Sequence, residues 1–249
     1  MFRIILGMGT DQLKNVAIFG DSILRGVMID NITKKYVFSK SIDWKGIEKE
    51  LNIKISNFSK MGSTIKYGYS KLDNYLKNNP DADVIILEFG GNDSDYDWIK
   101  VASEKSEKHT SKTSMCDFEK ILNDMLDLII QEDIKPIMMT LPPIHSTRYF
   151  DWLTRNGINK ESILNFLVDK EVIYRRQELF NAKIVEIANK RSIELVDIRS
   201  RFLASDDFLN LICEDGIHPN EIGENLIVQC FIEKFQKTKE EKNEIHTNC

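Results

Sequence analysis

Short apolar runs typical of β-strands alternate along the chain with longer segments in which apolar residues recur at helical spacing. Three of the strand-like runs are almost continuously apolar, and the second and fifth alternate between apolar and polar residues. The five expected strands are residues 16–19, 53–58, 84–89, 137–141 and 193–198. The helices expected to follow them are residues 41–51, 67–76, 118–130, 170–190 and 220–235.

A strand that is followed by a helix at every step predicts a parallel sheet with helices on both faces. Continuously apolar strands are buried on both faces, so the first, third and fourth strands are expected at the centre and the alternating strands at the edges. The strand order 2-1-3-4-5 satisfies this pattern. We therefore predict an α/β fold, a three-layer α/β/α sandwich of flavodoxin-like topology, whose ligands bind between the first and third strands at their carboxyl ends.

The domain organisation follows from the same pattern, because no repeat or low-complexity linker divides the chain. We expect one domain over residues 1–249, with a core at about 14–236 and a flexible charged tail at 237–249. Two connections, 94–115 and 144–168, are longer than a plain link between strand and helix requires. Loops of this length are often functional, so we expect a lid or pocket wall; the alternative is surface decoration with a small core of its own.

Charge and hydrophobicity narrow the range of partners. The 249 residues include 34 Lys and Arg against 39 Asp and Glu, for a net charge of −5. Nucleic-acid-binding proteins usually carry a basic face, so no nucleic-acid partner is expected. No apolar run approaches the ~18 residues that cross a membrane, and no membrane partner is expected either. The oligomeric state stays open.

The N-terminal segment and the cysteines indicate a cytoplasmic protein. The apolar patch at residues 4–6 is shorter than the core of a signal peptide, and translation could start at Met1 or at Met8. The four cysteines contain no C-x-x-C pair and predict reduced thiols rather than a disulfide framework. They are Cys116, Cys213, Cys230 and Cys249.

Residues capable of nucleophilic catalysis follow the predicted strands. Ser22 lies just after the first strand, and Gly62 and Asn92 follow the second and third. Asp215 precedes His218 by three residues, so its carboxylate can orient the imidazole as a general base for Ser22. Gly62 can offer an unobstructed backbone N–H, and Asn92 a side-chain amide, to an oxyanion.

The remaining candidates are residues that could contact the substrate. Among the other histidines, His145 follows two prolines and is expected to line a pocket, whereas His109 and His246 lie in polar, charged surroundings. Asp21 precedes the nucleophile, and Trp98 begins one of the long connections. We predict that Asp21, Trp98 and His145 bind substrate.

Taken together, these motifs resemble the SGNH/GDSL hydrolase family. The matching blocks span residues 16–222: Gly20-Asp21-Ser22, then Gly62, then Gly90-Gly91-Asn92-Asp93, and last Asp215-x-x-His218-Pro219. The resemblance implies a three-layer α/β/α fold. It also implies a catalytic triad of Ser22, Asp215 and His218, and an oxyanion hole of the Ser22 N–H, the Gly62 N–H and the Asn92 amide.

Two positions depart from the family pattern. Ile23 replaces a leucine, which should matter little. Ser59 replaces a second glycine before Gly62, so the loop that carries Gly62 could run differently.

The predicted activity is hydrolysis of a small-molecule ester through an acyl-enzyme, with no cofactor and no metal. Short, acetyl-like acyl groups are expected, with carbohydrate esters among the substrates, because no broad apolar surface adjoins Ser22 in the sequence. A lysophospholipase or acyl-thioesterase of the same fold is the alternative. Two less favoured hypotheses are a non-catalytic binding module and a metal-dependent phosphoesterase that would use Asp21, Asn92, Asp93, Asp215 and His218 as ligands.

Overall fold

A computed structural model describes residues 14–104 and 108–247. The predicted sheet is present: five parallel strands lie in the order β4-β1-β5-β6-β7, which is the predicted order 2-1-3-4-5. Their bounds are β1 Asn15–Phe19, β4 Lys54–Asn57, β5 Val84–Leu87, β6 Lys135–Met139 and β7 Glu194–Val196. The fully buried strand β5 lies at the centre, as its apolar sequence predicts.

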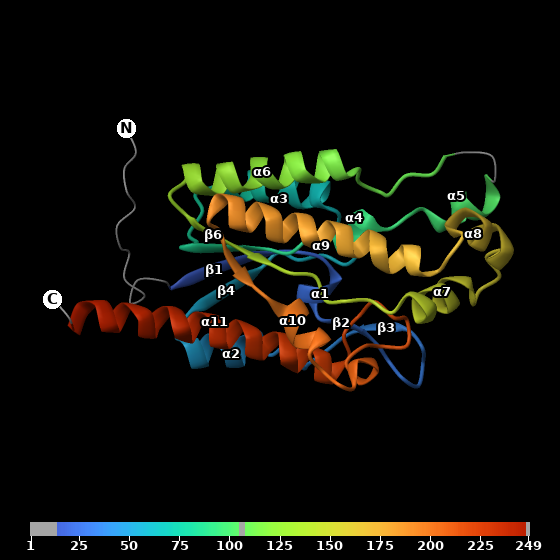
Figure 1. Cartoon of the computed structure of the whole chain (residues 1–249). Helices are drawn as coiled ribbons and strands as arrows, with labels where there is room; N and C mark the ends of the chain where they lie inside the picture. The colour runs from blue at the N-terminus through green and yellow to red at the C-terminus, as the bar shows by residue number, and fades with distance from the viewer. Residues whose placement is uncertain (1–13, 105–107, 248–249) are drawn as a thin grey trace.

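Helices cover both faces of the sheet and form two hydrophobic cores (Figure 1). Residues of α3, α6 and α9 pack on one face, with Phe118 and Phe180 in edge contact. Residues of α2, α10 and α11 pack on the other. The bounds are α2 Trp44–Leu51, α3 Ile65–Leu76, α6 Met115–Gln131, α9 Glu171–Arg191, α10 Ile198–Leu203 and α11 Glu221–Thr247.

The last helix differs from its prediction. It was expected to end near residue 235 and to be followed by a flexible tail, but α11 continues to Thr247. Lys and Glu, which dominate residues 237–244, are strong helix formers, so the charged composition that suggested a loose tail also supports a helix. Residues 248–249 and the segment before Lys14, including the alternative start at Met8, lie outside the described residues.

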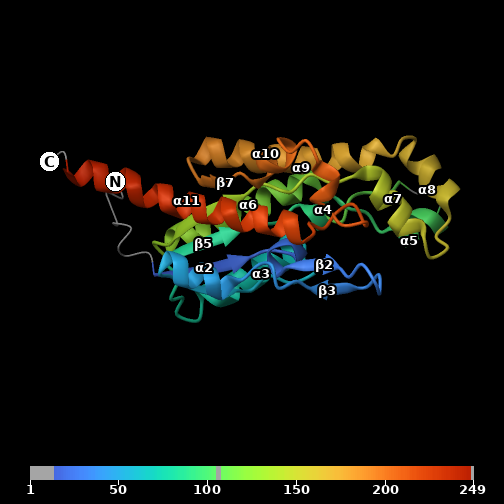
Figure 2. The same cartoon turned by 90° about the horizontal axis from the view of Figure 1, so that it is seen from below.

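The carboxyl end of the sheet carries several short elements that the hydrophobic pattern did not predict (Figures 1 and 2). Between β1 and α2, the chain forms the short helix α1 and an antiparallel hairpin of β2 and β3. The two long connections contain helices rather than irregular loops. The bounds are α1 Ser22–Arg25, β2 Val27–Ile29, β3 Tyr36–Phe38, α4 Gly91–Ser94, α5 Trp98–Ser103, α7 Ser146–Thr154, α8 Lys160–Leu167 and the 3-10 turn Phe208–Asn210.

The two long connections pack against each other. Tyr96 and Trp98 from the first contact Phe150 and Ile163 from the second in a separate small hydrophobic core. This is the satellite core that the sequence offered as the alternative to a lid. The two possibilities are not exclusive, because residues of the same segments also line a cavity beside Ser22.

Within the described residues, three thiols are free: Cys116 on the surface and the buried Cys213 and Cys230. None of the described helices is long and apolar enough to cross a membrane.

Candidate active site

Ser22 begins the short helix α1, three residues after the end of the interior strand β1. The carboxylate of Asp21 caps this helix by accepting a hydrogen bond from the backbone N–H of Ile23 at 2.9 Å. Four residues later Gly26, with φ of +72°, ends the helix in the left-handed conformation. This tight strand–helix–turn holds the Ser22 side chain at the carboxyl edge of the sheet, where it lines the cavity.

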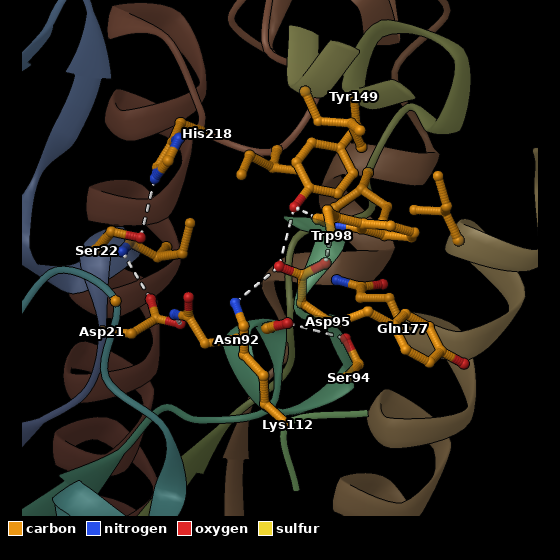
Figure 3. Close-up of a pocket in the computed structure, with 18 of the residues that line it drawn as sticks. Asp21, Ser22, Asn92, Ser94, Asp95, Trp98, Lys112, Tyr149, Gln177 and His218 are labelled. Atoms are coloured by element: carbon orange, nitrogen blue, oxygen red, sulfur yellow. Dashed lines mark hydrogen bonds and ion pairs between the residues drawn. The ribbon is translucent and has the colours of Figure 1, made fainter. Parts of the chain in front are cut away.

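His218 faces Ser22 from the loop that precedes α11 (Figure 3), and Asp215 lies on the same loop. Ser22 Oγ lies 2.9 Å from His218 Nε2, and His218 Nδ1 lies 2.5 Å from Asp215 Oδ2. A carboxylate only accepts hydrogen bonds, so Nδ1 carries the proton and Nε2 is free to accept from the Ser22 hydroxyl. The structure therefore brings the three predicted residues together, with the His218 imidazole between the Ser22 hydroxyl and the Asp215 carboxylate.

The carboxylate of Asp215 is fully buried, and three groups hold it in place. Its Oδ1 accepts from the backbone N–H groups of Ile217 and His218, both at 3.1 Å, while Oδ2 faces the imidazole. Hydrogen bonds of this kind are needed to offset the cost of burying a charge. They also fix the position of the carboxylate relative to the imidazole of His218.

Gly216 lets this loop pack tightly against the start of α7. Its φ is +76°, and its carbonyl accepts a hydrogen bond from the His145 backbone N–H at 2.8 Å. A Cβ atom added at Gly216 would lie 2.6 Å from the His145 carbonyl oxygen and 2.7 Å from the Tyr149 nitrogen. The short segment between Asp215 and His218 therefore requires glycine for both conformation and space.

The candidate oxyanion donors lie on the other side of Ser22. Asn92 is in the first turn of α4, after Gly90 has turned the chain with φ of +131°, and its amide donates to Asp21 Oδ2 at 2.8 Å. Gly62, with φ of +76°, lines the same cavity. The buried Ser59 hydroxyl lies beside Gly20, and Gly62 lines the cavity although Ser59 replaces the second glycine before it.

Two further buried carboxyl groups lie behind this site. Glu88 ends the apolar run of β5, and its Oε2 accepts from the Asp21 backbone N–H at 3.1 Å. Burial, reinforced by the charge of Asp21, raises the pKa of Glu88 well above its usual value, and burial also raises the pKa of Asp21. The sequence analysis did not single out Glu88, although one acid at the end of a run of four apolar residues was a usable signal.

Asp93 is the second of these groups. Burial raises its pKa to about 6, although its carboxylate accepts hydrogen bonds from the Ile65 N–H and from Thr113 Oγ1. Asp93 thereby ties the start of α3 and the end of the 94–115 connection to the strand end that carries Asn92.

A cavity of about 600 Å³ opens beside Ser22 and is here called the Ser22 cavity. The two long connections and α9 supply most of its far wall. Its lining is mainly apolar and aromatic. It includes Tyr36, Met61, Trp98, Ile99, Leu141, Ile144, Tyr149, Trp152, Leu153, Ile158 and Ile173.

Hydrogen bonds and an ion pair join four side chains of this far wall to one another (Figure 3). Trp98 Nε1 donates to Asp95 at 2.8 Å and to the Tyr149 hydroxyl at 3.1 Å. The Tyr149 hydroxyl and Lys112 Nζ both donate to Asp95 Oδ2 at 2.9 Å. Because these polar groups satisfy one another, the wall offers the cavity mainly the carbon surfaces of its aromatic side chains.

The three predicted substrate-binding residues have different positions. Asp21 and Trp98 line the cavity, although their polar atoms are engaged by protein groups. His145 is not part of the lining, which corrects the prediction. It caps α7, where its Nδ1 accepts from the Arg148 N–H at 3.1 Å. The two prolines before it lie in the connection between β6 and α7, and His145 comes at the point where the helix begins.

The ligand set suggested for a metal-dependent phosphoesterase is engaged in other contacts. Asp215 holds His218, and Asp21 accepts from Asn92. Over residues 14–104 and 108–247, no group of three or more His, Cys, Asp or Glu side chains is arranged to hold a metal ion.

Comparison with known proteins places this site in a family. Residues 18–226 match the model of the GDSL-like lipase/acylhydrolase family, and the chain belongs to that family. None of the curated proteins matches the chain significantly.

Solved structures share the fold. A lipase/acylhydrolase from Enterococcus faecalis superposes with a TM-score of 0.64 and 17% identity, over 90% of this chain and 96% of that one. The carbohydrate acetylesterase Est24 from Sinorhizobium meliloti gives 0.62 and 13%, over 90% and 99%. A GDSL-like lipase from Bacteroides thetaiotaomicron gives 0.60 and 17%, over 93% and 92%.

Proposed function

We propose that this protein is a carboxylic ester hydrolase that works through an acyl-enzyme on Ser22. The observation that carries the proposal is the hydrogen-bonded series from Ser22 through His218 to the buried Asp215. This is the arrangement by which a serine hydroxyl becomes a nucleophile at neutral pH. Membership of an acylhydrolase family supports the same reaction.

The proposed reaction has two halves. Ser22 Oγ attacks the ester carbonyl carbon while His218 Nε2 takes the hydroxyl proton. The resulting oxyanion accepts hydrogen bonds from the Ser22 N–H, the Gly62 N–H and the Asn92 amide. His218 then gives the proton to the leaving alcohol, and water resolves the acyl-enzyme by the same steps. Asp215 stays ionised throughout and orients the imidazole.

Nitrophenyl ester hydrolysis tests this proposal most directly. Ser22→Ala and His218→Ala should each abolish activity, and the double variant should be little worse than either because the residues act as a unit. A fluorophosphonate should add its phosphonyl group to Ser22, as read by peptide mass spectrometry. Full activity of folded Ser22→Ala would refute the proposal.

Chelation separates this mechanism from the phosphoesterase hypothesis. An esterase that relies on Ser22 and His218 should keep its rate in EDTA. Loss of activity in EDTA, with recovery on adding Mn²⁺ or Zn²⁺, would favour metal-assisted hydrolysis.

The first candidate substrate is a short, acetyl-like ester of a polar alcohol, with acetylated carbohydrates as the leading example. The aromatic faces of Trp98 and Tyr149 offer a surface on which a sugar ring can stack. The structural neighbour Est24 is a carbohydrate acetylesterase, although at 13% identity the likeness extends to the fold alone.

The second candidate is an ester or thioester with a longer acyl chain, as in a lysophospholipase or acyl-thioesterase. Its support is the Ser22 cavity, whose mainly apolar lining includes Tyr149 and Trp152 from the aromatic stretch that is the one candidate acyl wall in the sequence. Each methylene buried against such a wall contributes about 0.8 kcal/mol.

A chain-length series distinguishes the two candidates. We suggest measuring kcat/KM for nitrophenyl acetate, butyrate, octanoate and palmitate, followed by acetylated xylose. An acetyl optimum with turnover of the sugar ester supports the first candidate. A rise of about tenfold from acetate to butyrate, continuing to octanoate, supports the second.

A further inference from the structure

The β2–β3 hairpin lies against the loop that carries Asp215 and His218. Ile29 of β2 is buried and packs in one cluster with Cys213, the residue at the start of this loop. Lys34, at the hairpin turn, forms a 2.9 Å ion pair with Glu214. Figure 2 shows the hairpin projecting past the sheet. The hairpin and the loop therefore touch at several successive positions.

Tyr36, the first residue of β3, contacts the candidate base itself. Its ring meets the His218 imidazole edge-on, with centroids 5.2 Å apart and an interplanar angle of 65°. On its other side, the ring packs at 6.1 Å against Trp152 of α7. The Tyr36 hydroxyl accepts a hydrogen bond from Trp152 Nε1 at 2.9 Å. Tyr36 is thus fixed between α7 and His218.

The surroundings of Tyr36 keep its phenol neutral. The Tyr36 side chain is 38% exposed, and the burial of its remaining surface, together with the negative charge of Asp215, raises the pKa of Tyr36 to about 12. The other charged group nearby is Arg155, whose effect is opposite and smaller. At neutral pH, the side chain that packs against His218 is therefore an uncharged aromatic ring.

The His218 imidazole loses one of its two side-chain hydrogen bonds when the acyl-enzyme forms. When Ser22 becomes acylated, Ser22 Oγ loses its proton and can no longer donate to His218 Nε2. The hydrogen bond to Asp215 then holds only the Nδ1 end of the ring, and the imidazole can still rotate about that hydrogen bond. A packed aromatic side chain restricts that rotation, and it also keeps water from the His218–Asp215 hydrogen bond, which is stronger in a dry environment.

We propose that Tyr36 is a positioning residue that holds the His218 imidazole in line with Ser22 and shields its bond to Asp215. This inference rests on the proposed function. It gives the β2–β3 hairpin a role in the reaction, although the hairpin contains none of the family motifs found in this sequence.

Tyr36 also lines the Ser22 cavity, so a simple role in substrate binding must be distinguished. A binding residue affects mainly KM. A positioning residue affects kcat, and it changes the environment of the proton between His218 Nδ1 and Asp215. That proton gives a downfield ¹H NMR resonance when it is protected from exchange with water.

The experiment compares Tyr36→Leu, which removes the aromatic ring, with Tyr36→Phe, which keeps the ring and removes only the hydroxyl with its contacts to Trp152 and Asp215. Phe38→Leu is the matched control: Phe38 belongs to the same strand, is 65% exposed and does not line the cavity. Circular dichroism establishes that each variant folds. Each is then measured for kcat and KM on nitrophenyl acetate and for the downfield resonance.

We expect Tyr36→Leu to lower kcat by about tenfold and to lose the resonance through exchange, whereas Tyr36→Phe, which keeps the ring, should lower kcat by about twofold. Phe38→Leu should match the wild type. A wild-type kcat and an intact resonance in Tyr36→Leu would overturn the inference, as would a change in KM alone. If Tyr36→Leu does not fold, Tyr36→Met, which also removes the ring, is judged by the same two criteria.

Failure of the proposed function would look different. The wild-type protein would then hydrolyse no nitrophenyl ester and would show no fluorophosphonate on Ser22, whatever residue occupies position 36. The resonance can be recorded without any substrate, so the structural part of the inference is tested in either case.

Discussion

The carboxylate of Asp21 accepts a hydrogen bond from the side-chain amide of Asn92, with 2.8 Å between Oδ2 and Nδ2. An asparagine amide has two N–H donors. Because Asp21 engages one of them and is itself fixed as the cap of α1, the second donor has a defined direction. The residue before the nucleophile thus orients a group proposed to stabilise the oxyanion.

Asn92→Ala should therefore lower kcat by roughly 10²–10³, with little change in KM, because an oxyanion donor acts mainly in the transition state. Steady-state kinetics on a nitrophenyl ester checks this. Asp21→Asn, which replaces the acceptor of the Asn92 amide, should cause a smaller loss of the same kind. An increase in KM at constant kcat would show that Asn92 binds substrate instead.

Gly216 and Gly157 form a matched pair for testing the loop of the candidate base. Both have positive φ, +76° and +89°, but a Cβ at Gly216 would collide with backbone atoms of α7, whereas a Cβ at Gly157 meets nothing within 4 Å. Gly216→Ala should thus cost several kcal/mol of stability and most of the activity. Gly157→Ala should cost about 1 kcal/mol and no activity.

Urea denaturation and ester hydrolysis of the two alanine variants test this difference. Equal losses in both would mean that backbone strain alone, rather than the contact with α7, makes glycine necessary at position 216.

Asp93 should make the folded state less stable as the pH rises. Burial raises its folded-state pKa to about 6, above the unfolded value of 3.8. A carboxyl group with a raised folded pKa contributes its full stability below the unfolded pKa, and this contribution is lost as pH rises through the folded pKa. The loss between pH 4 and pH 7 should be at most about 3 kcal/mol.

Asp93→Asn isolates this effect, because asparagine does not titrate and its Oδ1 can still accept from Thr113 and Ile65. Unfolding free energies from urea titrations at pH 4, 5, 6 and 7 should fall more steeply in the wild type than in the variant. Parallel pH profiles would contradict the assignment.

Glu88 is expected to act as a neutral hydrogen-bonding group. Because the pKa of Glu88 is well above its usual value, Glu88→Gln should keep the contact with the Asp21 N–H and stay within about threefold of wild-type activity. Glu88→Ala leaves this buried N–H unpaired and should cost about 1–3 kcal/mol, in addition to the effect of the cavity that it creates. Equal behaviour of the two variants in urea denaturation would rule out this role.

The sheet could be predicted from the sequence because its strands are short runs with a clear choice between continuous and alternating apolar residues. The position of the candidate site followed from the sheet, because Ser22, Asn92 and His218 come after strand ends that meet at one edge. The hairpin could not be predicted in the same way. Three-residue strands such as Val27–Ile29 are too short to show a period, and Tyr36–Phe38 is largely exposed.

The substrate wall was equally inaccessible from the sequence. Helices α5, α7 and α8 have six to nine residues each and are stabilised by mutual packing in the satellite core. Which side of such a segment faces a cavity depends on those tertiary contacts. The aromatic residues were visible in the sequence, but the structure was needed to show that Trp98 and Tyr149 line the cavity beside Ser22 and that His145 does not.

The contact between Ser22 and His218 joins positions 196 residues apart. Ser22 follows β1 and His218 comes after β7, and strands β5 and β6 lie between these two strands in the sheet. Contacts of such long range are slow to form because the connecting chain must first be ordered. In a refolding experiment, the recovery of esterase activity should therefore be among the last events and should follow the return of helical structure measured by circular dichroism.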